Sequence, residues 1–331
     1  MSLPCGSQGA RGKSVKRLLD WLLLAVGLGG LVWYLSRFSG EFGRLANMSV
    51  GTLVLLSGVV LLGHLIFAAK LRTSVRIFGA SLTIREAFLL VEAGSFMNIL
   101  PLHMGTALRA LYLKKVARLK YVNYGLSFVV TQCTAFLVAG VIGLLFLCVI
   151  GGTFIGLQLV FLGYIIIAVG VLMGGYMARS ARLLELGAGR IRSRWWKQLL
   201  TSLQSGIGDI SSQPRAVMLW FGFDVLSNFV LGMRFFVVGQ SLGYGLDLAP
   251  AMVMQGITRI AAIFTVVASG TIGVREALTG LASSGLGKAA VAGVMIATID
   301  RIIVTMWFVV LGSVSLFVVR RRVFRATGRP T

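Results

Sequence analysis

Acidic and basic side chains stand inside stretches of this chain that are otherwise apolar. They are Glu92, Arg109, Asp224, Arg234, Arg259, Arg275, Glu276, Asp300 and Arg301. A charged side chain at the centre of a membrane helix costs about 3 kcal/mol on insertion scales, so each should face a cavity or a charged partner. We predict gating or charge-pair roles for five of them: Glu92, Asp224, Glu276, Asp300 and Arg301. Purely structural ion pairs between helices are the alternative.

Two of the apolar stretches are interrupted, and the interruptions predict a binding site for an anion. Pro101 breaks the first stretch and the run 269–273, SGTIG, breaks the second. A half-helix that begins at each break, near Pro101 or near Thr271, has unpaired N–H groups and a positive dipole end. Arg109 and Arg275 follow on these half-helices, and an arginine fork binds phosphate through two hydrogen bonds.

We therefore predict that a phosphate headgroup binds where the two breaks meet. The candidate substrate-binding residues are Asn98, Pro101, His103, Gly105, Arg109, Arg259, Gly270, Thr271, Gly273 and Arg275. Arginines that merely extend to water at the membrane surface are the alternative.

The composition predicts that membrane helices position these residues. The chain has 331 residues, of which 57% are hydrophobic, and repeated apolar runs of about 20 residues predict an all-α polytopic membrane protein. The net charge of +22 is concentrated in short segments, the pattern of cytoplasmic loops that attract anionic inner-leaflet lipids. These segments are 11–17, 70–85, 114–120, 179–215 and 320–329. We expect no nucleic-acid partner.

Cysteine and histidine usage predicts neither a disulfide framework nor a metal or other cofactor. Cys5, Cys133 and Cys148 show no paired spacing, and the two histidines are too few for a metal cluster.

The placement of basic loops predicts the topology. Six full spans are expected at 18–36, 50–69, 124–150, 155–178, 216–239 and 289–319, with the basic tails 1–17 and 320–331 in the cytoplasm. The interrupted segments 86–113 and 251–286 each begin and end on one side, so we interpret them as re-entrant helical hairpins. Thr83 and Glu86 predict a capping box at the start of the first hairpin.

This order predicts two membrane repeats, 18–150 and 151–319, of inverted topology, which is typical of transporters. The basic segment 179–215 belongs to the second repeat, and its Trp195–Trp196 pair suggests a helix on the inner leaflet, with a solvated loop as the alternative. Eight full spans, with both interrupted segments crossing, are the alternative topology.

Two motifs give the chain a specific resemblance. The run 98–109, NILPLHMGTALR, resembles the N-x-x-P-x-x-x-G-x-x-x-R motif of the lysylphosphatidylglycerol synthase transmembrane region family, also called the flippase-like domain family. The run 269–276, SGTIGVRE, is similar to that family's second motif. The resemblance covers about residues 15–320. It implies a bacterial inner-membrane protein that moves lipids between leaflets, as the membrane half of the multiple peptide resistance factor does.

The chain departs from the family pattern at two positions that bear on headgroup preference. His103 stands where the family often has a basic residue, and Thr106 where it often has Glu. Only about a dozen residues follow the last predicted span and the longest loop has about 37, so we expect no counterpart of the soluble aminoacyl-transfer domain of the multiple peptide resistance factor. We therefore expect a transporter and not an enzyme that makes the lipid.

The resemblance implies an anionic, aminoacylated or polyprenyl-phosphate lipid as substrate. Two other functions remain open. One is an integral-membrane enzyme that acts on a lipid phosphate. The other is a non-transporting subunit of a hopanoid or polyprenyl-glycan pathway.

Overall fold

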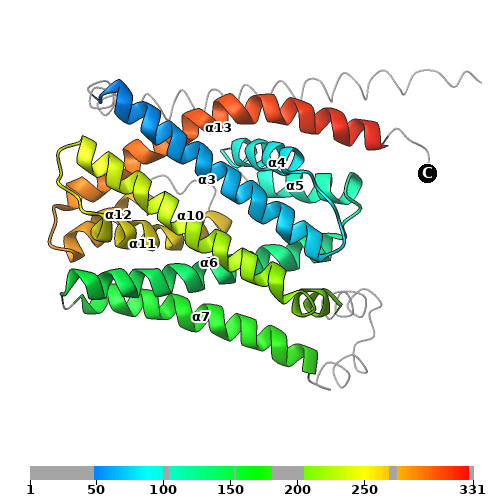
Figure 1. Ribbon diagram of the computed structural model, residues 1–331, viewed down its shortest axis with the longest axis horizontal. Coiled ribbons are helices and arrows are strands. Elements are labelled where there is room, and N and C mark those ends of the chain that lie inside the picture. Colours follow the sequence, from blue (N-terminus) through cyan, green and yellow to red (C-terminus); the bar gives the residue numbers. More distant parts are fainter. Residues whose placement is uncertain (1–47, 100–103, 153, 181–204, 268–273, 328–331) are drawn as a thin grey trace, which may run out of the picture.

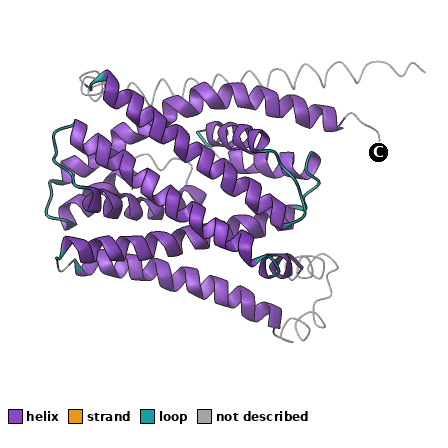
Figure 2. Ribbon diagram, viewed as in Figure 1, coloured by secondary structure: helices purple, strands orange, loops and turns teal. Residues whose placement is uncertain are grey.

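The computed structural model describes residues 48–99, 104–152, 154–180, 205–267 and 274–327, and every regular element among them is a helix (Figures 1 and 2). This confirms the predicted all-α class. The predicted first span at 18–36 lies outside the described residues, as does most of the basic segment 179–215, including Trp195 and Trp196.

Among the described residues, five helices are long and apolar enough to cross a membrane. They are α3 (Val50–Ile77), α6 (Tyr121–Ile150), α7 (Ile155–Ser180), α10 (Pro214–Ser241) and α13 (Ala290–Thr327). Large apolar side chains are exposed along them, for example Val149 at 73% and Val314 at 65%. Such a surface suits a lipid environment, and the chain is a multi-pass membrane protein.

Four shorter helices form two consecutive pairs, α4 (Ile84–Met97) with α5 (Met104–Lys115), and α11 (Leu248–Val267) with α12 (Val274–Gly285). The gaps between partners fall at the predicted breaks. The members of each pair pack against each other, and the two pairs lie toward opposite ends of the molecule (Figure 1). The predicted capping box is confirmed, because Thr83 Oγ1 accepts from the Glu86 N–H while the Glu86 carboxylate accepts from the Thr83 N–H.

Glycines let the first pair approach closely. A Cβ on Gly105 would lie 1.8 Å from the Gly94 carbonyl oxygen, and a Cβ on Gly94 would lie 2.3 Å from Arg109 Nε. Both distances are far shorter than any real contact, so only glycine fits at position 105, and a side chain at position 94 would displace the Arg109 side chain. This approach holds the Arg109 side chain directly against α4.

The helices enclose two apolar cores. One lies among α3, α6, α7, α10, α11, α12 and α13 and includes Phe161, Phe235 and Met254. The other lies among α3, α4, α5 and α13 and includes Leu90 and Leu113. Val91 and Tyr124 of the second core also line the cavity described below.

One helix boundary differs from the prediction in a way that matters for function. The second span was expected to end at Ala69, but α3 continues to Ile77. Lys70, which the basic-loop pattern assigned to the cytoplasmic surface, is only 5% exposed. A buried partner for its ammonium group, described below, explains why the helix can continue through it. The last helix also runs beyond the predicted 319, to Thr327.

Candidate functional site

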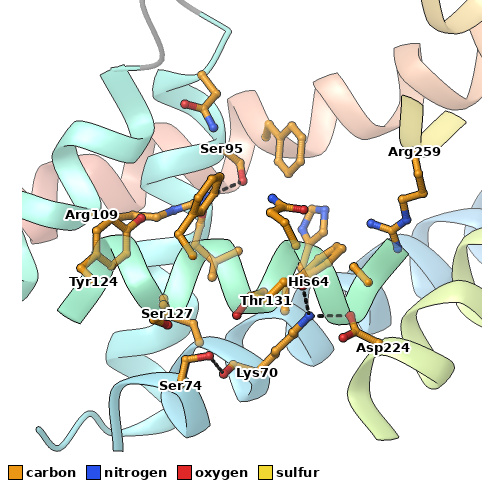
Figure 3. Close-up of a pocket in the computed structure, with 18 residues that line it drawn as sticks. His64, Lys70, Ser74, Ser95, Arg109, Tyr124, Ser127, Thr131, Asp224 and Arg259 are labelled. Atoms are coloured by element: carbon orange, nitrogen blue, oxygen red, sulfur yellow. Dashed lines mark hydrogen bonds and ion pairs between the residues drawn. The ribbon is translucent and has the colours of Figure 1, made fainter. Parts of the chain in front are cut away.

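A cavity of about 320 Å³ lies where the first helix pair meets the long helices (Figure 3). Side chains from α3, α4, α5, α6, α10, α11 and α13 line it. Its ionisable lining residues are His64, Lys70, Arg109, Tyr124, Asp224 and Arg259. His64 lies half-way along α3, so the cavity is close to the middle of a membrane-crossing helix.

A buried ion pair forms one wall of the cavity. Lys70 Nζ lies 2.5 Å from Asp224 Oδ1 and also donates to the Thr131 carbonyl at 3.3 Å. The pair joins α3 to α10, and both residues are buried. The second oxygen of Asp224 is buried without a hydrogen-bond partner among the described residues. Asn228, one turn further along α10, donates to the Asp224 backbone carbonyl at 2.8 Å.

Arg109 reaches the cavity from α5. Its Nη2 donates to the Val91 carbonyl at 3.1 Å and to Ser95 Oγ at 3.2 Å, both on α4. Its Nε is buried and has no hydrogen-bond partner in the described chain. Tyr124 lies beside the guanidinium group (Figure 3). The guanidinium is thus held in place against α4, with its Nε packed on Gly94.

Arg259 reaches the same cavity from α11. Its Nε and Nη2 are both buried, and neither has a hydrogen-bond partner within the described residues. The side chain extends toward Asp224 (Figure 3). A buried cation with two unpaired donors is costly unless a ligand completes its hydrogen bonds.

His64 and Glu92 form a second buried contact at the cavity. His64 Nδ1 lies 2.9 Å from Glu92 Oε1, with side-chain exposures of 3% and 0%. The imidazole stacks on the Phe308 ring with a centroid distance of 4.9 Å. His64 and Phe308 line the cavity, and Glu92 lies behind them.

A separate charge cluster joins α10, α12 and α13. Asp300 accepts from Arg234 through two bonds of 2.7 and 2.6 Å, and from Arg275 Nη2 at 2.6 Å. Arg301 Nη1 lies 3.0 Å from Glu276 Oε1. Asp300 and Arg301 therefore find separate partners, as adjacent helical residues must.

The predicted site residues divide into four groups. Asn98, Arg109, Asp224 and Arg259 line the cavity, and Gly105 packs against α4 beside them. Glu92 lies behind the lining, whereas Arg275, Glu276, Asp300 and Arg301 belong to the separate cluster. Pro101, His103, Gly270, Thr271 and Gly273 lie outside the described residues.

The position of Arg275 changes its assignment. Its guanidinium is engaged by Asp300 and lies 5.4 Å from the centroid of the Phe235 ring, and it does not line the cavity. Of the predicted phosphate-binding arginines, we retain Arg109 and Arg259, which line the cavity.

Sequence reasoning did not select His64, Lys70, Ser95 or Tyr124. His64 and Lys70 did carry a signal, because each is polar and ends or interrupts the apolar run of α3. Their six-residue spacing gave no indication of a shared cavity, which depends on partners from α4 and α10.

A further ion pair lies outside the cavity, between the first turn of α4 and the last turns of α13. The Glu86 carboxylate contacts Arg322 as well as Thr83. Partial burial disfavours the charged carboxylate, but the hydrogen bonds from Thr83 and the contact with Arg322 outweigh it and hold the pKa of Glu86 below its ordinary value. The pair fastens the start of α4 to the end of α13.

Fold and site together define a polytopic helical membrane protein with a cationic cavity half-way along its spans. The model of the lysylphosphatidylglycerol synthase TM region family matches residues 19–312, and the chain belongs to this family. The family is associated with the synthesis and translocation of lysylphosphatidylglycerol. No curated protein and no solved structure matches the chain.

Proposed function

We propose that this protein moves a phosphate-bearing lipid between the two leaflets of the bacterial inner membrane, with both termini in the cytoplasm. The observation that carries the proposal is the pair Arg109 and Arg259. They stand on helices from different interrupted pairs, they line one cavity, neither has an acid at ion-pair distance among the described residues, and Arg259 has two buried donors without partners there. A phosphate group would neutralise both charges and accept hydrogen bonds from Arg259.

The charge of the cavity supports an anionic headgroup. Lys70 and Asp224 neutralise each other, so Arg109 and Arg259 leave an excess of two positive charges on the lining. Neither arginine forms an ion pair within the described part of the chain. An anion is therefore the ligand that this cavity would bind most favourably.

Helix lengths support the re-entrant interpretation of the first interrupted segment. Helix α4 has 14 residues and α5 has 12. At 1.5 Å per residue they are about 21 and 18 Å long, too short for a hydrocarbon core of about 30 Å. The lengths favour a hairpin that enters and leaves on one side. With the second pair toward the opposite end, two inverted halves would rock about the cavity and give alternating access.

The test is leaflet exchange by the purified protein in vesicles. The probe is phosphatidylglycerol with an acyl-chain fluorophore, in vesicles of phosphatidylcholine and phosphatidylglycerol, and dithionite quenches the outer leaflet. We expect exchange well above that of protein-free vesicles. Arg259→Gln removes donors to a charged group, a loss of about 1.5–3 kcal/mol, and should slow exchange about 10- to 100-fold.

Arg72→Gln is the matched control, because Arg72 is exposed on α3 outside the cavity lining. Absence of exchange by the wild type would refute the proposal. Release of a headgroup or phosphate in the same vesicles would instead identify an enzyme.

A further inference from the structure

His64 and Glu92 form a buried acid–base contact that phosphate binding does not use. Nδ1 of His64 lies 2.9 Å from Oε1 of Glu92, and neither carboxylate oxygen has a hydrogen-bond donor with good geometry in the part of the chain that is described. Helix α13 packs closely on the backbone of α4 at Glu92, since a Cβ on Gly312 would lie 2.9 Å from the Glu92 carbonyl oxygen. The side chain through which Glu92 meets the cavity is His64.

Such a contact holds a variable number of protons. With one shared proton it is neutral overall, whether as imidazolium and carboxylate or as imidazole and carboxylic acid. With none it carries one negative charge. Imidazole is the side chain whose ordinary titration lies nearest neutral pH.

The other charged and titratable groups at the cavity come from five elements. They are Lys70 on α3, Arg109 on α5, Tyr124 on α6, Asp224 on α10 and Arg259 on α11. Helix α13 contributes the neutral ring of Phe308, and its Asp300 and Arg301 are engaged in the separate cluster. The other charged groups at the cavity thus have a net positive charge, and protonation of the His64–Glu92 contact makes the total charge more positive.

We propose that His64 and Glu92 form a proton-binding site, and that a proton crosses the membrane with each anionic lipid headgroup. This inference rests on the proposed function and adds the coupled ion to it. The proton comes from hydronium in the cavity, which leaves as water, and it returns to water on the far side. No bond other than this N–H or O–H bond forms or breaks.

Charge linkage gives the direction of the coupling. Without the proton, Glu92 opposes the two arginines, and the cavity has a net charge of about +1; with it, the net charge is about +2. A phosphate group binds better to the protonated form. Because linkage is reciprocal, a bound phosphate also increases the affinity for the proton. The two ligands are therefore carried together, in the same direction.

The geometry also suits a proton that must reach both sides. His64 is half-way along α3, and its ring is fixed by the stack on Phe308. When the two halves rock about the cavity, the imidazole would face first one side and then the other, while Glu92 remains behind it. A phosphate monoanion and a proton together carry no net charge, so the transport step would not depend on membrane potential.

The decisive experiment measures the steady-state distribution of the fluorescent phosphatidylglycerol between leaflets under a pH gradient of one unit. Valinomycin and potassium hold the membrane potential at zero. One proton per lipid corresponds to about 1.4 kcal/mol for this gradient, so the lipid should accumulate up to about tenfold in the leaflet on the alkaline side. Orientation of the protein in the vesicle does not alter this ratio.

Two variants assign the effect to the site. Glu92→Gln and His64→Gln should each abolish the accumulation, because each removes one half of the contact. Glu86→Gln is the matched control: it makes the same change on the same helix, at the cap and outside the cavity, and glutamine is accepted in a capping box. It should retain the accumulation. Detergent melting checks the folding of all three proteins.

Each outcome decides one point. Exchange at equal pH without accumulation under the gradient would overturn proton coupling and leave the proposed function standing. Absence of exchange under any condition would overturn both. Full accumulation by folded Glu92→Gln would place the proton elsewhere and refute the site. The wild-type ratio decides the coupling even if both cavity variants fail to fold.

Discussion

Removal of the Asp224 charge should destabilise the protein more than removal of its partner Lys70. Both residues are buried and 2.5 Å apart, and breaking such a pair from one side costs about 3–5 kcal/mol because the remaining charge has no partner. Asp224→Asn leaves the Lys70 ammonium near Arg259 with no acid on the cavity lining. Lys70→Met leaves the Asp224 carboxylate, but Arg259 has two unpaired donors nearby and can turn to it.

We therefore expect a loss near the full 3–5 kcal/mol for Asp224→Asn and about half of that for Lys70→Met. The double variant removes both charges, so neither remains buried without a partner. Its stability should therefore be closer to that of the wild type than the stability of Asp224→Asn alone. Thermal melting in one detergent of the wild type, the two single variants and the double variant ranks the four proteins by stability. A Lys70→Met protein less stable than Asp224→Asn would refute the role given to Arg259. A double variant less stable than both singles would refute the pairing itself.

Three further changes test other contacts of the structure. Gly105→Ala places a methyl group where no space exists, so it should lower stability by about 1–3 kcal/mol in detergent melting, whereas Gly125→Ala, in open space on α6, should not. The pKa of Glu86 is lowered in the folded protein, so its contribution to stability is present above about pH 4.5 and is lost as the pH falls below that value. Glu86→Gln lacks this titrating group. Its melting temperature should therefore change less than that of the wild type between about pH 7 and about pH 4. Cysteines at Ser81 and Lys120, both exposed, should be labelled from the same side of the membrane in a chain without its native cysteines, and labelling from opposite sides would favour eight spans.

The helices could be predicted from the sequence because apolar runs and breaks are local signals. The interruption at Pro101 and the Gly-rich run 269–273 predicted two pairs of shorter helices, and the capping box at Thr83 fixed the start of α4 within one residue. Glu276 and Arg301, both predicted to have gating or charge-pair roles, lie at ion-pair distance from each other.

The site was harder to predict because its contacts join residues far apart in the chain. Lys70 and Asp224 are 154 residues apart, and nothing in either segment specifies the other. Lys70 also gave a misleading local signal, since it begins a basic cluster typical of a loop while its side chain turns into the protein. For Arg275 the motif predicted contact with a ligand, but in the structure its guanidinium forms an ion pair with Asp300.

The distribution of acids explains why these two arginines, and not others, are available to a ligand. Among the described residues, the acids within α4, α10, α12 and α13 are Glu86, Glu92, Asp224, Glu276 and Asp300, and each contacts a basic partner. Asp300 contacts two arginines, Arg234 and Arg275, so Arg275 on α12 is not available to a ligand. Arg109 and Arg259 have no acid at ion-pair distance within the described chain, yet their guanidinium nitrogens are buried. The fold pairs its other buried charges but leaves these two arginines without an acid at one cavity. Two buried charges without partners lower the stability of the protein, and this is the pattern expected where a bound anion supplies the missing partner.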